Sequence, residues 1–135
     1  MTLTILAAGA ALAQECGPGD TFPALADTGA WNWCQDPKAV TYVGEHRRTY
    51  TGWVAGDGSI MVAHYDHETG EIVTSNLHER LERDDHNNPV FEVMHNGRVT
   101  AYYSPHGGSR EDDVIHGLYY RRSFALESAA SWGPE

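Results

Sequence analysis

Two histidines, His86 and His106, stand 20 positions apart in the stretch DDHNNPVFEVMHNGRVTAYYSPH, which spans residues 84–106. Imidazole has an unperturbed pKa of about 6.5, so a histidine suits general acid–base catalysis near neutral pH. Zn²⁺ binding is a second interpretation, with Asp84 or Asp85 as a further ligand. A third is that both are ordinary polar residues at exposed strand ends. Familiar zinc spacings such as His-x-x-x-His or Cys-x-x-Cys are absent, so no cofactor is expected, although a structural metal ion is possible.

The elements that would position this pair are strands. Alternating apolar runs separated by turn residues predict an all-β protein. Asp57-Gly58 and Asn96-Gly97 indicate two-residue type I′ hairpin turns, in which both central residues need positive φ. Two short segments, 78–83 and 126–131, could be helical. The expected strands are Ala39–Val43, Thr49–Ala55, Ser59–Tyr65, Glu71–Leu77, Val90–Met94, Val99–Tyr103 and Leu118–Phe124.

A two-residue turn at Asn96-Gly97 would place Asn87 opposite His106 and His86 opposite Gly107. Directly opposed residues have Cβ atoms about 4.5–5.5 Å apart and diagonal neighbours about 7–8 Å apart. His86 and His106 should therefore be near neighbours at the open end of one hairpin.

A two-residue turn at Asp57-Gly58 in the first hairpin would likewise place Arg48 opposite His67. We expect both hairpins to gather cationic or titratable side chains at the same end of the molecule, where a ligand would bind. Asn87, Arg48 and His67 are the candidate substrate-binding residues.

The two hairpins also match each other at an offset of 39, with Ile60 falling on Val99 and His67 on His106. A period of about 40–45 residues carrying several strands is typical of β-propeller blades. An antiparallel sandwich is the alternative. Near the C-terminus, Ser123 and Trp132 resemble a degenerate Asp-box hairpin of sialidase-type propellers.

The length after residue 38 allows about two blades, whereas propellers close with about four to eight. We therefore expect a fragment of a larger propeller or one part of an assembly, with possible self-assembly or further blades missing.

The composition excludes some partners. The formal net charge of −10 becomes only −2 (−10 + 8) when all eight histidines are protonated. Nucleic-acid binding, which needs a cationic surface, is therefore not expected. No apolar stretch is long enough to cross a bilayer, so no membrane protein is expected.

Residues 1–13, MTLTILAAGAALA, resemble a secretory signal without its basic region, although an apolar strand or helix is the alternative. We therefore expect a secreted or periplasmic protein, divided into residues 1–13 (signal), 14–38 (N-terminal segment) and 39–135 (partial propeller). Cys16 and Cys34 could form a disulfide in an oxidising compartment or remain free thiols.

Several motifs together resemble the BNR repeat-containing family, whose relatives include β-propeller ulvan lyases. The resemblance covers about residues 31–135, and DDHNNP followed by the SPHG motif is its most specific part. The motifs are residues 33–40 (WCQDPKAV), 48–54 (RTYTGWV), 65–67 (YDH), 84–89 (DDHNNP), 103–107 (YSPHG) and 120–123 (YRRS).

The resemblance implies β-elimination on an acidic, uronic-acid polysaccharide, with His86 and His106 as the catalytic pair. The chemistry needs a base at C5 of the uronate and a cation at its carboxylate. The family's tyrosine and arginine should lie beyond residue 135. Tyr119, Tyr120, Arg121 and Arg122 are chemically capable, but strand packing and solvated surface explain them better.

Three other functions remain open. A non-catalytic propeller that binds glycans or partners is the main alternative. A sialidase-like hydrolase is disfavoured because the arginine triad, nucleophilic tyrosine and intact Asp boxes of that class are not recognisable. The chain could also be inactive by itself. Family resemblance alone does not fix function.

Overall fold

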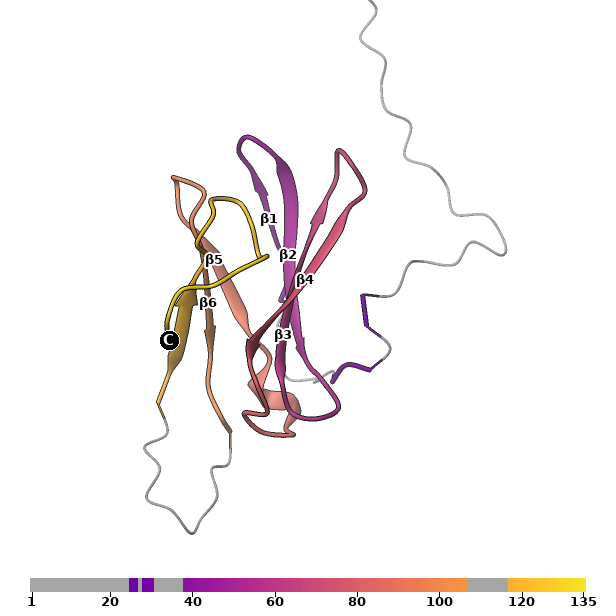
Figure 1. Cartoon of the computed structure of the whole chain (residues 1–135), viewed down its shortest axis with the longest axis vertical. Coiled ribbons are helices and arrows are strands. Elements are labelled where there is room, and N and C mark those ends of the chain that lie inside the picture. The colour runs from indigo at the N-terminus through magenta and orange to yellow at the C-terminus, as the bar shows by residue number, and fades with distance from the viewer. Residues whose placement is uncertain (1–24, 27, 31–37, 107–116) are drawn as a thin grey trace, which may run out of the picture.

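The computed structural model describes residues 25–26, 28–30, 38–106 and 117–135. These residues form two antiparallel sheets, ordered β1-β2-β3-β4 and β5-β6-β7 (Figure 1). The all-β prediction is confirmed, and each predicted strand is found with its ends shifted by at most two residues. The elements are β1 Val40–Val43, β2 Arg47–Val54, β3 Ile60–Asp66, β4 Ile72–His78, the 3₁₀ helix η1 Asp85–Asn87, β5 Val90–Val93, β6 Val99–Tyr103 and β7 Tyr119–Arg122.

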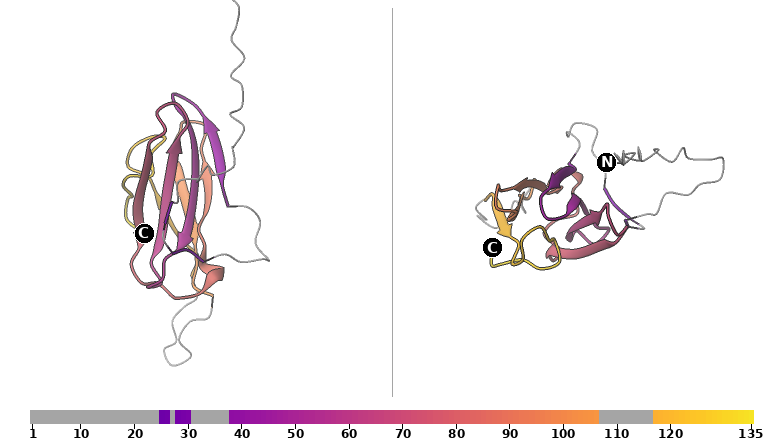
Figure 2. Two further views of the ribbon diagram at one scale, coloured as in Figure 1. Left: turned by 90° about the vertical axis from the view of Figure 1, so that its right-hand side faces the viewer. Right: turned by 90° about the horizontal axis from the view of Figure 1, so that it is seen from above.

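The two sheets face each other across one core (Figure 2). Successive side chains of a strand point to opposite faces, so alternate residues of β2, β3, β6 and the end of β4 supply this core. Neither sheet closes on itself within the described residues. Two facing sheets are therefore what the fold shows, and the propeller remains a prediction. The buried residues of this core cluster are Tyr50, Val54, Ile60, Val62, Leu77, Val99, Ala101, Tyr103, Ala129 and Trp132.

The predicted turn type is wrong in both hairpins. In the first, Gly58 N donates to Ala55 O (2.9 Å) and Ala55 N donates to Ser59 O (2.8 Å), which closes a three-residue loop. The loop at Gly97 repeats both bonds 39 positions later, at 2.8 and 2.9 Å. Only the final glycine of each loop has positive φ, +89° at Gly58 and +81° at Gly97. This is the three-residue loop with a left-handed glycine, not the two-residue type I′ turn.

The extra loop residue shifts the predicted register by one. Arg48 pairs with Asp66 instead of facing His67, and Val90 pairs with Tyr102. A one-residue slip moves every side chain of a strand to the other face, so the correction decides which residues reach the core. Continued beyond Val90, the observed register sets His86 against His106.

The predicted repeat is local and does not extend to the tertiary fold. The turn at Gly97 lies beside the β1–β2 loop, where Tyr42 Oη donates to His95 O (3.3 Å). The turn at Gly58 lies at the opposite end of the molecule, beside η1 (Figure 1). The 39-residue offset therefore reflects the same three-residue loop geometry, and the two hairpins point in opposite directions.

Neither predicted helix is present. β4 continues through His78, and Arg80 takes a left-handed conformation with φ 49°. In the second segment Glu127 has φ 53°, and an isolated antiparallel bridge joins Ser123 to Trp132. The left-handed residues stop helix formation at both places. The paired serine and tryptophan are those that resemble a degenerate Asp box.

The predicted signal at residues 1–13 and the Cys16–Cys34 pair lie outside the described residues. Ala30, from the segment before β1, donates its N–H to Val54 O at 3.1 Å, so residues 28–30 extend along the end of β2. Among the described residues, no helix has the length and apolar character needed to cross a membrane.

Candidate functional site

The candidate site is built on η1, the short connection between β4 and β5. Asp84 caps this helix, because its Oδ1 accepts the backbone N–H of His86 at 2.8 Å. Asn88 ties the connection to β2, where its Oδ1 accepts the N–H of Val54 at 3.0 Å. Its Nδ2 also donates to Asp85 O at 2.9 Å. The site therefore rests on hydrogen-bonded backbone at the lower end of the first sheet.

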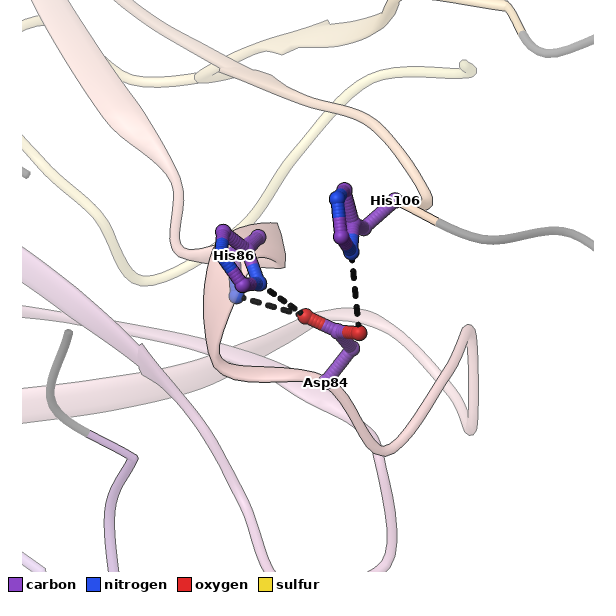
Figure 3. Close-up of side chains that lie close together, drawn as sticks. All are labelled: Asp84, His86 and His106. Atoms are coloured by element: carbon purple, nitrogen blue, oxygen red, sulfur yellow. Dashed lines mark hydrogen bonds and ion pairs between the residues drawn. The ribbon is translucent and has the colours of Figure 1, made fainter. Parts of the chain in front are cut away.

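Three side chains converge there (Figure 3). His86 Nδ1 lies 2.6 Å from Asp84 Oδ1, and His106 Nδ1 lies 3.1 Å from Asp84 Oδ2. The imidazole rings stack with centroids 4.0 Å apart and planes inclined by 25°. The prediction that His86 and His106 are near neighbours is confirmed. What the sequence did not indicate is that a single carboxylate bridges them.

Asp84 is ionised at neutral pH. The backbone N–H of His86 is the main cause that lowers its pKa to about 2, and the His86 and His106 side chains lower it further against the opposing effect of desolvation. An ionised carboxylate only accepts hydrogen bonds. Both rings must therefore carry a hydrogen at Nδ1, and in a neutral ring the basic lone pair then lies at Nε2.

His106 is also held through its backbone. Its N–H donates to Glu82 Oε2 at 2.8 Å, and the same oxygen accepts a hydrogen bond from Asn87 Nδ2 at 3.1 Å. Asn87 is buried, with 1% of its surface exposed. This predicted substrate-binding residue therefore lies beneath the site and joins the two histidine-bearing segments through Glu82.

A cavity of about 470 Å³ lies beside the cluster, within the range of about 300–1,000 Å³ usual for small-ligand sites. Asp84 and Asp85 form one wall together with the exposed Arg83. The end of β2 and the turn after it also line the cavity. The remaining lining residues are Thr28, Gly29, Ala30, Val54, Ala55 and Gly56.

The structure contradicts the expected gathering of Arg48 and His67 with the histidine pair. Both lie toward the opposite end of the first sheet, near the β3–β4 turn (Figure 1). The Arg48 side chain has a structural role. Its Nε donates to Asp66 Oδ2 at 2.9 Å, and its guanidinium donates to Glu127 O at 2.6 Å. His67 is exposed and bonds Thr49 Oγ1 through Nε2 at 2.8 Å. The opposite directions of the two hairpins explain the miss.

The tyrosines and arginines of β7 have the packing and surface roles expected. Arg121 donates to two carbonyl oxygens, Gly133 O at 2.7 Å and Leu77 O at 2.6 Å. Tyr119 stacks on Tyr103 with centroids 5.8 Å apart. Tyr120 and Arg122 face solvent on the outer side of the second sheet.

The sequence did not indicate that Arg83 and residues 28–30 line the cavity. Arg83 follows Glu82 and precedes two aspartates, so its place in a charged run gave no sign that it borders a cavity. Residues 28–30 carry no motif, and only their pairing with Val54 brings them there.

Among the residues that the structure describes, two groups have metal-ligating side chains within 4.8 Å of one another: Asp84 with His86 and His106, and His46 with Asp66 and Glu68. No family model matches the chain, and no curated protein or solved structure has significant similarity to it.

Proposed function

We propose that the chain carries a proton-abstraction site for β-elimination on uronic-acid polysaccharides, as part of a secreted, lyase-like β-propeller. The observation that carries the proposal is the carboxylate of Asp84, which accepts hydrogen bonds from Nδ1 of both His86 and His106. The resemblance to the BNR repeat-containing family supports the substrate class, and the two facing antiparallel sheets are compatible with adjacent propeller blades.

His106 is the residue we assign as the base. Its side chain is 54% exposed, and with Nδ1 turned toward Asp84 its Nε2 is the nitrogen that can accept a proton. A carboxylate that fixes the tautomer and stabilises the imidazolium is the arrangement used in the aspartate–histidine pairs of hydrolases. His86 stacks on the His106 ring and shares the same carboxylate, so it orients the base.

In the proposed step, His106 Nε2 takes the C5 proton of the uronate. The C–H electron pair forms the C4–C5 double bond as the C4–O bond breaks, and the leaving oxygen takes a proton from water. Negative charge builds on the uronate carboxylate, so a cation is needed beside it. Arg83 is exposed and lines the cavity together with Asp84, so we assign it as the cation that binds this carboxylate.

The experiment is an assay for unsaturated uronate products, followed by their ultraviolet absorbance, with ulvan-type polysaccharide and the complete protein. Replacing His106 by Ala should lower kcat by about 10²–10⁴-fold, the usual contribution of a general base. His67→Ala is the matched control, because His67 is an exposed histidine away from the cluster. Wild-type activity in the His106 variant would overturn the assignment.

A non-catalytic glycan-binding function is the second candidate, favoured by an aromatic row on the outer face of the second sheet. Tyr102 and Tyr120 are cross-strand partners with ring centroids 6.2 Å apart, and the Arg122 guanidinium lies 5.6 Å from the Tyr120 centroid. Exposed tyrosines present flat apolar area with a polar edge. This candidate predicts polysaccharide binding that Tyr120→Ala weakens and His106→Ala leaves unchanged, with no double bond formed.

A further inference from the structure

We infer that Asp84, His86 and His106 form a binding site for one divalent transition-metal ion such as Zn²⁺ or Co²⁺. The ligands would be Nδ1 of each histidine and a carboxylate oxygen of Asp84. One ligating atom from each of the three residues lies within 4.8 Å of the other two. The inference does not require the elimination chemistry. The metal-bound form and the base-competent form of His106 exclude each other, because an Nδ1 bound to an ion leaves the ring hydrogen on Nε2.

The observed geometry is close to what such an ion needs. Zn²⁺ binds histidine nitrogen at about 2.0–2.1 Å and carboxylate oxygen at about 2.0–2.2 Å, so tetrahedral ligand atoms stand about 3.3–3.5 Å apart. His86 Nδ1 now lies 2.6 Å from Asp84 Oδ1, and His106 Nδ1 lies 3.1 Å from the other carboxylate oxygen, Oδ2. For each nitrogen to stand at the tetrahedral separation from the oxygen it now contacts, its ring must move outward by less than about 1 Å.

The rings are able to make that movement. Their side chains are 40% and 54% exposed, and their planes already diverge by 25°. A further tilt would bring both Nδ1 lone pairs onto one point in front of Asp84. Glu82 and η1 hold the backbone on either side, so the movement involves side-chain torsions only.

The donor set selects the class of metal. Two imidazole nitrogens and one carboxylate suit Zn²⁺, Co²⁺ or Ni²⁺, whereas Ca²⁺ and Mg²⁺ prefer sites made of oxygen. Asp85 Oδ1 lies 3.2 Å from His86 Nδ1 and could supply a fourth ligand. Otherwise water would complete the coordination, as in the open sites of zinc enzymes.

The second group of metal-ligating side chains provides an internal comparison. In the group of His46, Asp66 and Glu68, both oxygens of Asp66 are already used. Oδ2 accepts from the Arg48 guanidinium at 2.9 Å, and Oδ1 accepts the backbone N–H of Glu68 at 2.9 Å. The adjacent guanidinium charge repels a cation, so this group should not bind the metal.

The test is titration of the full chain with Co²⁺, followed by the visible absorption of the bound ion, and with Zn²⁺ by calorimetry. We expect one ion per chain, with affinity lowered about 100-fold or more in His86→Ala, His106→Ala and Asp84→Asn. Asn at position 84 still caps η1, so that variant separates loss of a ligand from loss of structure.

His46→Ala is the matched control and should bind the ion as the wild type does. Absence of stoichiometric binding in the wild type, or equal affinity in the three cluster variants, would overturn the inference. Loss of binding in His46→Ala would overturn it as well, because the ion would then occupy the other group. None of these readouts depends on activity, so the result is separate from that of the lyase assay.

Discussion

At the scale of single residues, one carboxylate decides the chemistry of the candidate site. Asp84 caps η1 through Oδ1 and contacts both imidazoles, so it positions backbone and side chains together. The sequence predicted that His86 and His106 meet, because a hairpin brings residues on either side of its turn together. It could not predict the bridge, since the side-chain direction of Asp84 is fixed by η1, which the sequence did not indicate.

The role of Asp84 predicts a specific kinetic effect. In Asp84→Asn the amide nitrogen would face one of the two Nδ1 atoms, so the hydrogen of that ring would shift to Nε2. If His106 is the base, kcat should fall by about 10²–10⁴-fold, with a much smaller change in KM. Steady-state kinetics with Asp85→Asn as the control tests this expectation. An unchanged kcat in the Asp84 variant would contradict the orienting role.

A buried histidine predicts how stability depends on pH. His64 is 2% exposed, and its Nδ1 accepts the backbone N–H of Ala129 at 3.0 Å. Burial is the main cause that lowers its pKa, and the Arg48 charge lowers it further. The charges of Asp66 and Glu71 raise it by less, and His46 has a smaller lowering effect. The unfolded chain therefore binds the proton more readily than the folded one. Stability should be full above about pH 6.5 and decline as the pH falls toward the lower folded pKa.

Urea unfolding at several pH values measures this effect. His64→Phe should lose about 1–3 kcal/mol near neutral pH, because the Ala129 N–H loses its acceptor. The variant should also show a weaker decline of stability between about pH 7 and 5. His67→Phe replaces an exposed histidine and should retain the wild-type dependence. Equal pH dependence in wild type and His64→Phe would exclude His64 as the source.

At the scale of elements, the strands followed from alternating apolar patterns, but the connections between them did not. Asp-Gly and Asn-Gly fit either a two-residue or a three-residue loop, and only backbone geometry distinguishes them. That single residue changed the partner of Arg48 from His67 to Asp66, and the opposite directions of the two hairpins separated both predicted site residues from the histidine pair. The segment 126–131 was misread because its role depends on distant loops, not on local propensity.

Glu127, in that segment, joins connections from both sheets. Its carboxylate accepts the N–H groups of Glu45 and His46 at 2.9 and 2.8 Å, in the β1–β2 loop. Its own N–H donates to Gly97 O at 2.6 Å, in the β5–β6 loop. Burial alone would raise the pKa of Glu127, but the two backbone donors and neighbouring charges bring it below the usual value.

Glu127→Ala should therefore destabilise the fold by about 1–3 kcal/mol for each backbone donor left without its acceptor. Denaturant unfolding monitored by circular dichroism gives this value. Glu68→Ala, at an exposed position of the β3–β4 turn, is the control and should change stability by less than about 0.5 kcal/mol. A Glu127 variant as stable as the control would show that the loops do not depend on the carboxylate.

At the scale of the whole molecule, the two sheets share their core, so they should unfold together. Trp132 lies in that core with 6% of its surface exposed, and its Nε1 donates to Ser75 Oγ of β4 at 2.9 Å. It thereby connects the end of the chain, paired with Ser123 after β7, to the first sheet. Trp132→Ala should cost about 3–5 kcal/mol, and Trp132→Phe less, because the ring volume is mostly kept.

Unfolding of the wild type followed by far-ultraviolet circular dichroism and by tryptophan fluorescence should give coincident single transitions. In Trp132→Ala, the far-ultraviolet and near-ultraviolet dichroism signals should shift together to lower denaturant concentration. If the variant instead lost the signal of one sheet while the other stayed folded, the sheets would be independent units, as separate blades of a longer repeat can be. Coincident transitions would mean that the β1–β4 and β5–β7 sheets form one cooperative unit. The histidine pair, which bridges η1 and the end of β6, would then be held in place by the stability of the whole fold.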